Sequence, residues 1–341
     1  MTVRVGINGF GRIGRSFTRA LLARGADSGV ELVAVNDPFG DSATMAFLLS
    51  HDSVGGLLPN EVKVTDAGFS IDGNEVKKLD TREPGEIPWG SNGVDIVIES
   101  TGLFTAREKA AEHLKGGAKR VVISAPSSDA DVMICMGVND STFDAEHHTV
   151  ISNASCTTNC LAPLAKVLHT AFGIENGLMT TVHAYTSDQQ LQDQAVATRS
   201  GKPDLRRMRA AALSIIPNTT GAARAIGLVL PDLKGRLDGM ALRVPTPTGS
   251  ITDLVANVAK PASVEEVNAA FQQAAADTGY RGVLEYNDEP LVSADIVGNP
   301  SSCIYSSLDT MVNGSTVKVL GWYDNEWGYS NRLIDLVEFI G

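Results

Sequence analysis

The sequence predicts an α/β protein of two domains, a doubly wound sheet at the N-terminus and an α+β domain with a mixed or antiparallel sheet after it. Three observations carry this prediction. The length of 341 residues suits about two domains. The first 40 residues alternate strand and helix patterns, as a parallel sheet covered on both faces requires. After about residue 156, longer strand patterns joined by loops replace that alternation.

The N-terminal half opens as strand, turn, helix and strand, which is a βαβ unit of ordinary length. Later apolar runs with a helical pattern between them extend the predicted parallel sheet. The expected strands are Val3–Ile7, Glu31–Val35, Val94–Ile98 and Val121–Ile123, and the expected helices are Arg15–Ala26 and Ala106–Lys115.

The C-terminal half follows a short strand pattern at Val150–Ser152. We place the domain boundary near Ser155, so that residues 1–155, completed by 323–341, form the first domain and residues 156–322 the second. The expected helices are Leu161–Phe172, Val264–Ala276 and Asn331–Ile340, and the expected strands are Leu178–Tyr185, Met240–Val244, Thr252–Val258 and Val317–Trp322.

The charge of the chain limits its partners. There are 28 basic and 40 acidic residues, for a formal charge of -12. We therefore expect no nucleic-acid partner, and anionic ligands must be held by local clusters. No apolar run approaches the roughly 20 residues of a membrane span and no signal-peptide pattern is present, so we expect a cytoplasmic protein without a membrane partner. Four cysteines without Cys-x-x-Cys spacing indicate neither a disulfide framework nor a metal site.

Gly9, Gly11 and Gly14 form a G-x-G-x-x-G motif that follows a strand and opens a helix. In this context Gly9 permits a tight turn, Gly11 lets the backbone approach a pyrophosphate, and Gly14 lets helix and strand pack closely. The motif predicts a Rossmann-like dinucleotide site, the alternative being a packing turn without a ligand. Asp37, roughly 20 residues further on, would accept hydrogen bonds from a ribose diol and favours NAD over NADP. Its alternative is a turn residue before Pro38.

Cys156 lies between a strand pattern and a helix pattern. A helix N-terminus stabilises a thiolate, and an imidazole brought close by the fold would lower the thiol pKa further. Cys156 is therefore a candidate nucleophile, against the alternative of a buried, inert thiol. Cys160, one helical turn later, is interpreted as structural. Among six histidines, His183 ends a strand-like run and is the preferred base, whereas His113 and His169 fall in helical patterns and are interpreted as surface or core residues.

Several arginines are candidates for binding phosphate. Arg243 follows an apolar run, and Arg206, Arg207 and Arg209 cluster in a loop-like segment. A guanidinium offers a planar fork of donors that matches phosphate oxygens. For most arginines the alternative, a solvated surface side chain, is the better interpretation.

Three longer motifs occur in order along the chain: INGFGRIGR at 7–15, SNASCTTNCLAP at 152–163 and WYDNEWGYS at 322–330. With them the sequence resembles phosphorylating glyceraldehyde-3-phosphate dehydrogenase of the bacterial type, over almost the whole chain. The resemblance implies NAD-dependent oxidation of glyceraldehyde 3-phosphate to 1,3-bisphosphoglycerate, a step of glycolysis or gluconeogenesis, by a homotetramer. The first domain would bind NAD and the second would be catalytic.

The resemblance also implies a role for each matching residue. Cys156 would attack the aldehyde and carry a thioester, and His183 would activate the thiol and take up the proton. The implied NAD contacts, beside the glycines, are Arg12, Ile13, Asp37, Arg82, Ser124 and Asn325. Inorganic phosphate would be bound by Ser155, Thr157, Thr220 and Gly221 with help from Arg206 or Arg207. The substrate phosphate would be bound by Thr186 and Arg243.

One segment departs from the family pattern. Residues Gln194–Pro203 form a longer connection than the short proline-containing turn typical of bacterial members. In the family this S-loop lines the tetramer core and approaches the cofactor of a neighbouring subunit. We therefore hypothesise a specialised isoform whose Cys156 is less open to bulky covalent inhibitors than to its small substrate.

Two other functions compete with this prediction. The chain could be another phosphorylating aldehyde dehydrogenase, acting on a four-carbon sugar phosphate or on a semialdehyde, although the paired Thr and Arg phosphate sites argue against semialdehydes. It could also be a nucleotide-sensing regulator that has lost catalysis. A regulator would need to keep neither Cys156 nor His183, and the chain has both.

Overall fold

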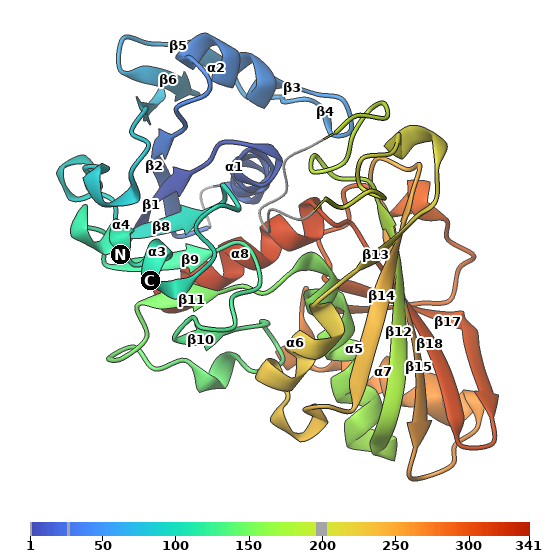
Figure 1. Cartoon of the computed structure of the whole chain (residues 1–341). Helices are drawn as coiled ribbons and strands as arrows, with labels where there is room; N and C mark the ends of the chain where they lie inside the picture. Colours follow the sequence, from blue (N-terminus) through green and yellow to red (C-terminus); the bar gives the residue numbers. More distant parts are fainter. Residues whose placement is uncertain (1, 26–27, 196–202) are drawn as a thin grey trace. The chain divides into compact units, whose positions relative to one another are not determined.

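The chain forms two units of structure and returns to the first unit at its C-terminus (Figure 1). The computed structural model describes residues 2–25, 28–195 and 203–341. Unit 1 comprises the residues up to Ser155 together with Tyr329–Gly341, and unit 2 comprises Cys156–Gly328. The C-terminal segment thus rejoins unit 1 at residue 329. The sequence predicted that the segment completing the first domain starts at residue 323. Residues 196–202 of the loop Gln194–Pro203 lie outside the described residues.

Unit 1 is built on a sheet of nine strands in the order β10-β11-β9-β8-β1-β2-β7-β6-β5. All neighbours from β10 to β7 are parallel, and the two pairs at one edge, β7–β6 and β6–β5, are antiparallel. The strands are β1 (Val3–Asn8), β2 (Val30–Asn36), β5 (Val62–Val64), β6 (Gly68–Ile71), β7 (Asn74–Leu79), β8 (Ile96–Glu99), β9 (Arg120–Ile123), β10 (Val132–Met133) and β11 (Val150–Ser152).

Four of the described helices connect these strands, and a fifth, at the C-terminus, begins at Trp327 and lies mostly in unit 1. They are α1 (Arg12–Arg24), α2 (Ser42–Ser50), α3 (Arg107–Ala110), α4 (Glu112–Lys115) and α8 (Trp327–Ile340), and a small hairpin is formed by β3 (His51–Asp52) and β4 (Gly56–Leu57). The predicted helix at 106–115 is divided into α3 and α4. Helix α1 begins at Arg12, inside the glycine motif, because the turn at Gly9 is complete by Gly11.

Unit 2 is built on a sheet of seven strands in the order β13-β14-β12-β15-β18-β17-β16. The pairs β12–β14 and β16–β17 are parallel and the other pairs antiparallel, so the sheet is mixed. The strands are β12 (Ile174–Ala184), β13 (Ile216–Thr219), β14 (Leu237–Val244), β15 (Ser250–Val258), β16 (Leu284–Asn287), β17 (Cys303–Asn313) and β18 (Thr316–Tyr323), and the helices are α5 (Cys156–Phe172), α6 (Ala222–Val229) and α7 (Val264–Ala276).

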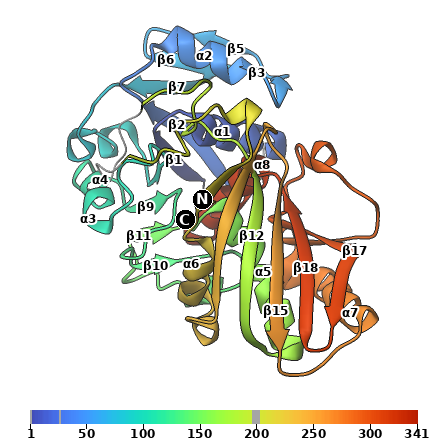
Figure 2. The ribbon, with the colours of Figure 1, turned by 45° about the vertical axis from the view of Figure 1, so that its right-hand side comes forward.

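Helices cover one face of the unit 2 sheet (Figure 2). Helix α5 packs against β15, β17 and β18, and α7 packs against β16 and β17. Side chains alternate accordingly, with Met179 and Leu254 almost completely buried while Leu178 on the other face is 69% exposed. Among the residues that the structure describes, no helix of unit 2 covers the other broad face of this sheet.

The predicted fold class, a doubly wound sheet followed by an α+β unit with a mixed sheet, is confirmed. Two differences are informative. Helix α5 begins at Cys156, not at Leu161, so the Thr-Thr-Asn segment after the cysteine is helical. Strand β17 was not predicted from the sequence. Its pairing with β18 shifts register between Ser306 and Met311, which interrupts the simple alternation that marks a strand.

Candidate active site

Unit 1 contains a cavity at the carboxyl ends of β1 and β2. Its volume is about 410 Å³, within the range of small-molecule sites. The carboxyl ends of parallel strands are where open α/β sheets bind ligands. The lining residues are Asn8, Gly9, Gly11, Asn36, Asp37, Pro38, Phe39, Thr81, Arg82, Glu83, Ser100, Thr101, Leu103 and Phe104.

The three glycines of the motif have different surroundings. Gly9 has a φ of +91°, and a Cβ there would lie 2.7 Å from the backbone nitrogen of Thr101. A Cβ on Gly14 would lie 2.7 Å from the carbonyl oxygen of Gly9. At Gly11, by contrast, a Cβ would meet nothing within 4 Å. Gly9 and Gly14 are thus required by close packing, and the open backbone at Gly11 suits the approach of a pyrophosphate.

Asp37 and Arg82 both line the cavity. The Asp37 carboxylate accepts one hydrogen bond at each oxygen, from the N–H of Phe10 (3.0 Å) and from the N–H of Phe39 (3.0 Å). Each oxygen keeps a further lone pair for a ribose hydroxyl. Asp37 therefore closes the turn and forms part of the cavity wall. The Arg82 guanidinium lies 5.3 Å from the centre of the Phe39 ring.

Three other predicted NAD contacts are not among the residues that line this cavity. Arg12 forms an ion pair with Asp52. Ile13 is the half-buried second residue of α1. Ser124 donates from its N–H and its hydroxyl to the carbonyl oxygen of Glu99, both at 3.0 Å. Their predicted contacts with NAD stay predictions.

In unit 2, Cys156 is the first residue of α5. Its Sγ lies 3.5 Å from Nε2 of His183, the penultimate residue of β12. The predicted nucleophile and base are therefore neighbours in space, although 27 positions separate them. Upstream of the helix, Ala154 has a φ of 56°, a left-handed conformation that non-glycine residues rarely adopt.

The hydrogen bonds of His183 determine its tautomer. Nδ1 lies 2.7 Å from the carbonyl oxygen of Ala184, which can only accept. It also lies 3.0 Å from Nη1 of Arg243, but the two protons of Nη1 are directed to the Ala184 carbonyl and the Thr186 hydroxyl, so Nδ1 carries the proton. Nε2 therefore presents its lone pair to the Cys156 thiol. This is the tautomer that a general base needs, and the backbone of the same strand holds it in place.

Burial dominates the electrostatics of the pair. It raises the pKa of the Cys156 thiol to about 11, although Arg243 and hydrogen bonds with Thr157 act to lower it. Burial and the Arg243 charge lower the pKa of His183 to about 3. Burial thus outweighs the helix N-terminus and the imidazole, so the thiol pKa is shifted upward and not downward as expected from the sequence. The pair is a neutral thiol beside a neutral imidazole, because desolvation penalises both charged forms.

Arg243 lies directly across from His183 in the parallel register of β12 and β14. Its Nη1 donates to the carbonyl oxygen of Ala184 and to the hydroxyl of Thr186, both at 3.0 Å. The Thr186 hydroxyl in turn donates to Asp188, which also forms an ion pair with Arg207. Two arginines and a threonine are thus linked into one polar cluster next to the base.

The other residues predicted to bind inorganic phosphate make different contacts from those of the polar cluster. Ser155 is half-buried at the end of unit 1. The buried Thr157 hydroxyl lies 2.9 Å from the hydroxyl of Tyr323, so it already has one hydrogen bond in the core.

The Thr220 hydroxyl accepts the N–H of Ala222 at 3.2 Å, and Gly221 is the exposed N-cap of α6. Arg206 is exposed and donates weakly to the carbonyl oxygen of Pro217, at 3.5 Å.

Asn325 is buried in unit 2 with its amide orientation determined by its neighbours. The Ser250 hydroxyl accepts the N–H of Ala184 (3.0 Å), so it donates its proton to Oδ1 of Asn325 (2.9 Å). The Asn325 amide nitrogen is consequently left to act as a donor. A donor is what recognition of a nicotinamide carbonyl requires.

Two family models match the chain. The model described as "Glyceraldehyde 3-phosphate dehydrogenase, NAD binding domain" matches residues 3–107, and the one described as "Glyceraldehyde 3-phosphate dehydrogenase, C-terminal domain" matches residues 155–325. The glyceraldehyde-3-phosphate dehydrogenase of Streptomyces coelicolor is 58% identical over 342 residues, covering 100% of this chain and 99% of the relative. That of Mycobacterium leprae is 57% identical over 345 residues with the same coverage. The chain belongs to the glyceraldehyde-3-phosphate dehydrogenase family.

Family membership makes NAD the cofactor, and the unit 1 cavity fits it. The open backbone at Gly11 leaves room for a pyrophosphate, and the Asp37 oxygens keep free lone pairs. Among the helices that the structure describes, none has the length and apolar character needed to cross a bilayer.

Two residues that support the predicted site were not predicted from the sequence. The Tyr323 hydroxyl bonds Thr157 and Thr181, and its ring meets His183 edge-on at 5.9 Å. Asp188 joins Thr186 to Arg207. Tyr323 lies within the third sequence motif, which was a usable signal. Nothing in the local sequence pointed to Asp188.

The pKa shifts predict the pH dependence of thiol reactivity in the free enzyme. Because the thiol pKa is raised to about 11, the thiolate fraction increases about tenfold per pH unit throughout the neutral range. Alkylation of Cys156 by iodoacetamide, followed by peptide mass spectrometry, should accelerate from about pH 6 to about pH 10 without a plateau. A rate that levels off below about pH 7 would instead indicate a thiolate–imidazolium pair.

Proposed function

We propose that the protein catalyses the NAD-dependent, phosphorylating oxidation of glyceraldehyde 3-phosphate to 1,3-bisphosphoglycerate through a thioester on Cys156. The observation that carries this proposal is the 3.5 Å contact between Cys156 Sγ and His183 Nε2, at the start of a helix and the end of a strand. Membership of the family supports the substrate, the phosphate and the cofactor.

The residues of the chain account for each proton and bond. Cys156 attacks the aldehyde carbon while Nε2 of His183 takes the thiol proton, which leaves a hemithioacetal on sulfur. The N–H of Cys156, at the helix start, is the proposed donor to the developing oxyanion. When bound, NAD accepts the hydride that leaves the substrate carbon, and a thioester remains. Inorganic phosphate then attacks the thioester carbonyl and releases the acyl phosphate with the Cys156 thiolate, to which His183 returns the proton that it took in the first step.

Two anion sites are part of the proposal. Thr186 and Arg243 hold the substrate phosphate, which is supported by their 3.0 Å hydrogen bond beside the base. Ser155, Thr157, Thr220 and Gly221 serve the inorganic phosphate. Of the two candidate arginines we favour Arg207, because Asp188 connects it to Thr186. Arg206 is exposed, and its hydrogen bond to the carbonyl oxygen of Pro217 is long, at 3.5 Å.

We further propose that the protein is a cytoplasmic homotetramer. Support for assembly comes from the sheet face of unit 2 that α5, α6 and α7 leave uncovered. On this face Leu178 is 69% exposed and Met240 is 39% exposed, on neighbouring strands. Apolar side chains on a helix-free sheet face are typical of subunit interfaces.

The catalytic proposal predicts distinct effects for its two central residues. Cys156→Ser should abolish NADH formation while NAD still binds, because the serine hydroxyl is a much weaker nucleophile. His183→Asn should lower kcat by about 100- to 10,000-fold, the usual cost of losing a general base. The assay is NADH absorbance with glyceraldehyde 3-phosphate, and it should require added phosphate or arsenate.

Cys135→Ser is the matched control for that experiment, since Cys135 is a buried thiol of unit 1 and should leave turnover unchanged. Near-normal turnover of the Cys156→Ser enzyme, or NADH formation that is independent of phosphate and arsenate, would refute the proposed reaction.

The polar cluster predicts that Arg207 contributes more than Arg206 to the binding of inorganic phosphate. Arg207→Ala should raise KM for inorganic phosphate about tenfold or more, as expected for a lost charge-assisted hydrogen bond. Arg206→Ala, the same change one position away, should alter it less than about threefold. Steady-state rates at varied phosphate distinguish the two, and a larger effect of Arg206→Ala would reverse the assignment.

A further inference from the structure

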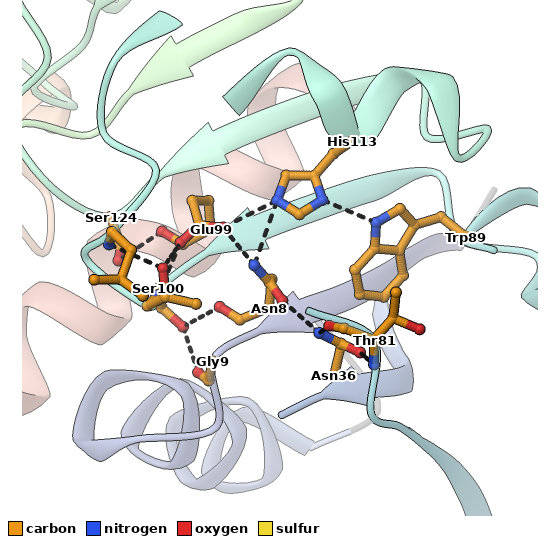
Figure 3. Close-up of polar contacts among 11 residues, drawn as sticks. Asn8, Gly9, Asn36, Thr81, Trp89, Glu99, Ser100, His113 and Ser124 are labelled. Carbon is orange, nitrogen blue, oxygen red and sulfur yellow. Dashed lines mark hydrogen bonds and ion pairs between the residues drawn. The ribbon is translucent and has the colours of Figure 1, made fainter. Parts of the chain in front are cut away.

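A buried polar network adjoins the unit 1 cavity (Figure 3). Its centre is Glu99, the last residue of β8, which is 1% exposed. One carboxylate oxygen accepts the N–H of Thr101 (2.9 Å) and its hydroxyl (2.5 Å). The other oxygen accepts the amide of Asn8 (2.6 Å) and Nε2–H of His113 (2.9 Å). All four groups around this carboxylate are donors.

The groups at the two outer ends of the network determine which atom donates in each of its hydrogen bonds. At one end the Trp89 indole N–H, which can only donate, lies 3.0 Å from Nδ1 of His113, so the His113 proton is on Nε2, toward Glu99. At the other end the backbone N–H of Thr81 donates to Oδ1 of Asn36 (2.9 Å). Asn36 therefore presents its amide nitrogen to Oδ1 of Asn8 (2.8 Å), and Asn8 presents its own to Glu99.

This network joins segments that are far apart in the sequence. Asn8, Asn36, Thr81 and Thr101 all line the cavity, and they come from β1, β2 and the segments after β7 and β8. Glu99 is not itself a lining residue. Through hydrogen bonds to Asn8 and Thr101, and through Asn8 to Asn36, one carboxylate holds several walls of the cavity in place.

We propose that Glu99 is a positioning residue for NAD, acting through Asn8 and Thr101 on the part of the cavity next to Asp37. The proposal rests on the NAD-dependent function given above. Asp37 at the end of the second strand marks this part as the side of the adenosine ribose. Glu99 therefore contributes to affinity for the adenosine half of the cofactor and not to the chemical step at Cys156.

Replacing Glu99 by glutamine tests this role directly. A glutamine head group has one accepting oxygen and one donating nitrogen, so its nitrogen must face a donor on one side or the other. Amide flips cannot relieve the conflict, because Trp89, the Thr81 N–H and the Thr101 N–H are donors that cannot be reversed. One buried donor is left without its acceptor, and either Thr101 or Asn8 must move.

Glu99→Gln should raise the dissociation constant for NAD, measured by calorimetry on the whole enzyme, by about tenfold or more. Adenosine diphosphoribose, which lacks the nicotinamide, should lose affinity by a similar factor. At saturating NAD, kcat should change less than about threefold, because Cys156 and His183 belong to unit 2. A variant with reduced kcat and unchanged affinity for both ligands would overturn the proposal.

Two controls separate positioning from loss of stability. Val97→Ala truncates a fully buried side chain of the same strand outside the network, and it should lower the melting temperature with little effect on the NAD dissociation constant. His113→Gln keeps an amide donor for Glu99, whereas His113→Leu does not, so only the leucine variant should weaken NAD binding. Equal weakening by Val97→Ala and Glu99→Gln, or by both His113 variants, would contradict the proposal. The proposed function itself is tested separately, by NAD binding and turnover of the unaltered enzyme.

Discussion

The contact between the Cys156 sulfur and Nε2 of His183 depends on how two elements of unit 2, α5 and β12, are held together. Helix α5 must begin at the cysteine, β12 must end beside it, and the carbonyl of Ala184 must keep the proton on Nδ1. The buried Tyr323 hydroxyl, bonded to Thr157 of the helix and Thr181 of the strand, connects α5 to β12 from below the site. Without this constraint, the thiol and the imidazole would be too far apart for a proton transfer between them.

The pairing of β12 with β14 also explains how an acidic chain could bind phosphorylated substrates. The chain carries a formal charge of -12, yet its proposed substrates are phosphates. Arg243 lies beside His183 because β12 and β14 are parallel neighbours, and this places a cation where it both lowers the histidine pKa and offers a fork to an anion. The same positive charge that keeps the base neutral can therefore orient a phosphorylated substrate. Asp188 balances the charge of Arg207 through an ion pair.

Local patterns allowed much of the fold and the core of the candidate site to be predicted. The glycine motif predicts the local structure because only glycine fits at Gly9 and Gly14, where a Cβ would collide with backbone atoms. Helix α7 has the ends that the sequence predicted, and in the structure a capping box at Ser263 stabilises its start. The first turn of α5 was missed because Thr157 and Thr158 have low helix propensity, and their burial in the tertiary structure overrides it. The raised thiol pKa was missed for a related reason, since desolvation depends on packing that no local pattern reveals.

The most direct test of the central claim is to isolate the covalent intermediate. The enzyme is mixed with NAD and glyceraldehyde 3-phosphate without phosphate, quenched in acid and digested, and the acylated peptide is identified by mass spectrometry. The account predicts a phosphoglyceroyl group on Cys156, which disappears when phosphate is added before the quench. Acylation at another residue, or an acyl group that phosphate does not release, would contradict the proposed roles of Cys156 and His183.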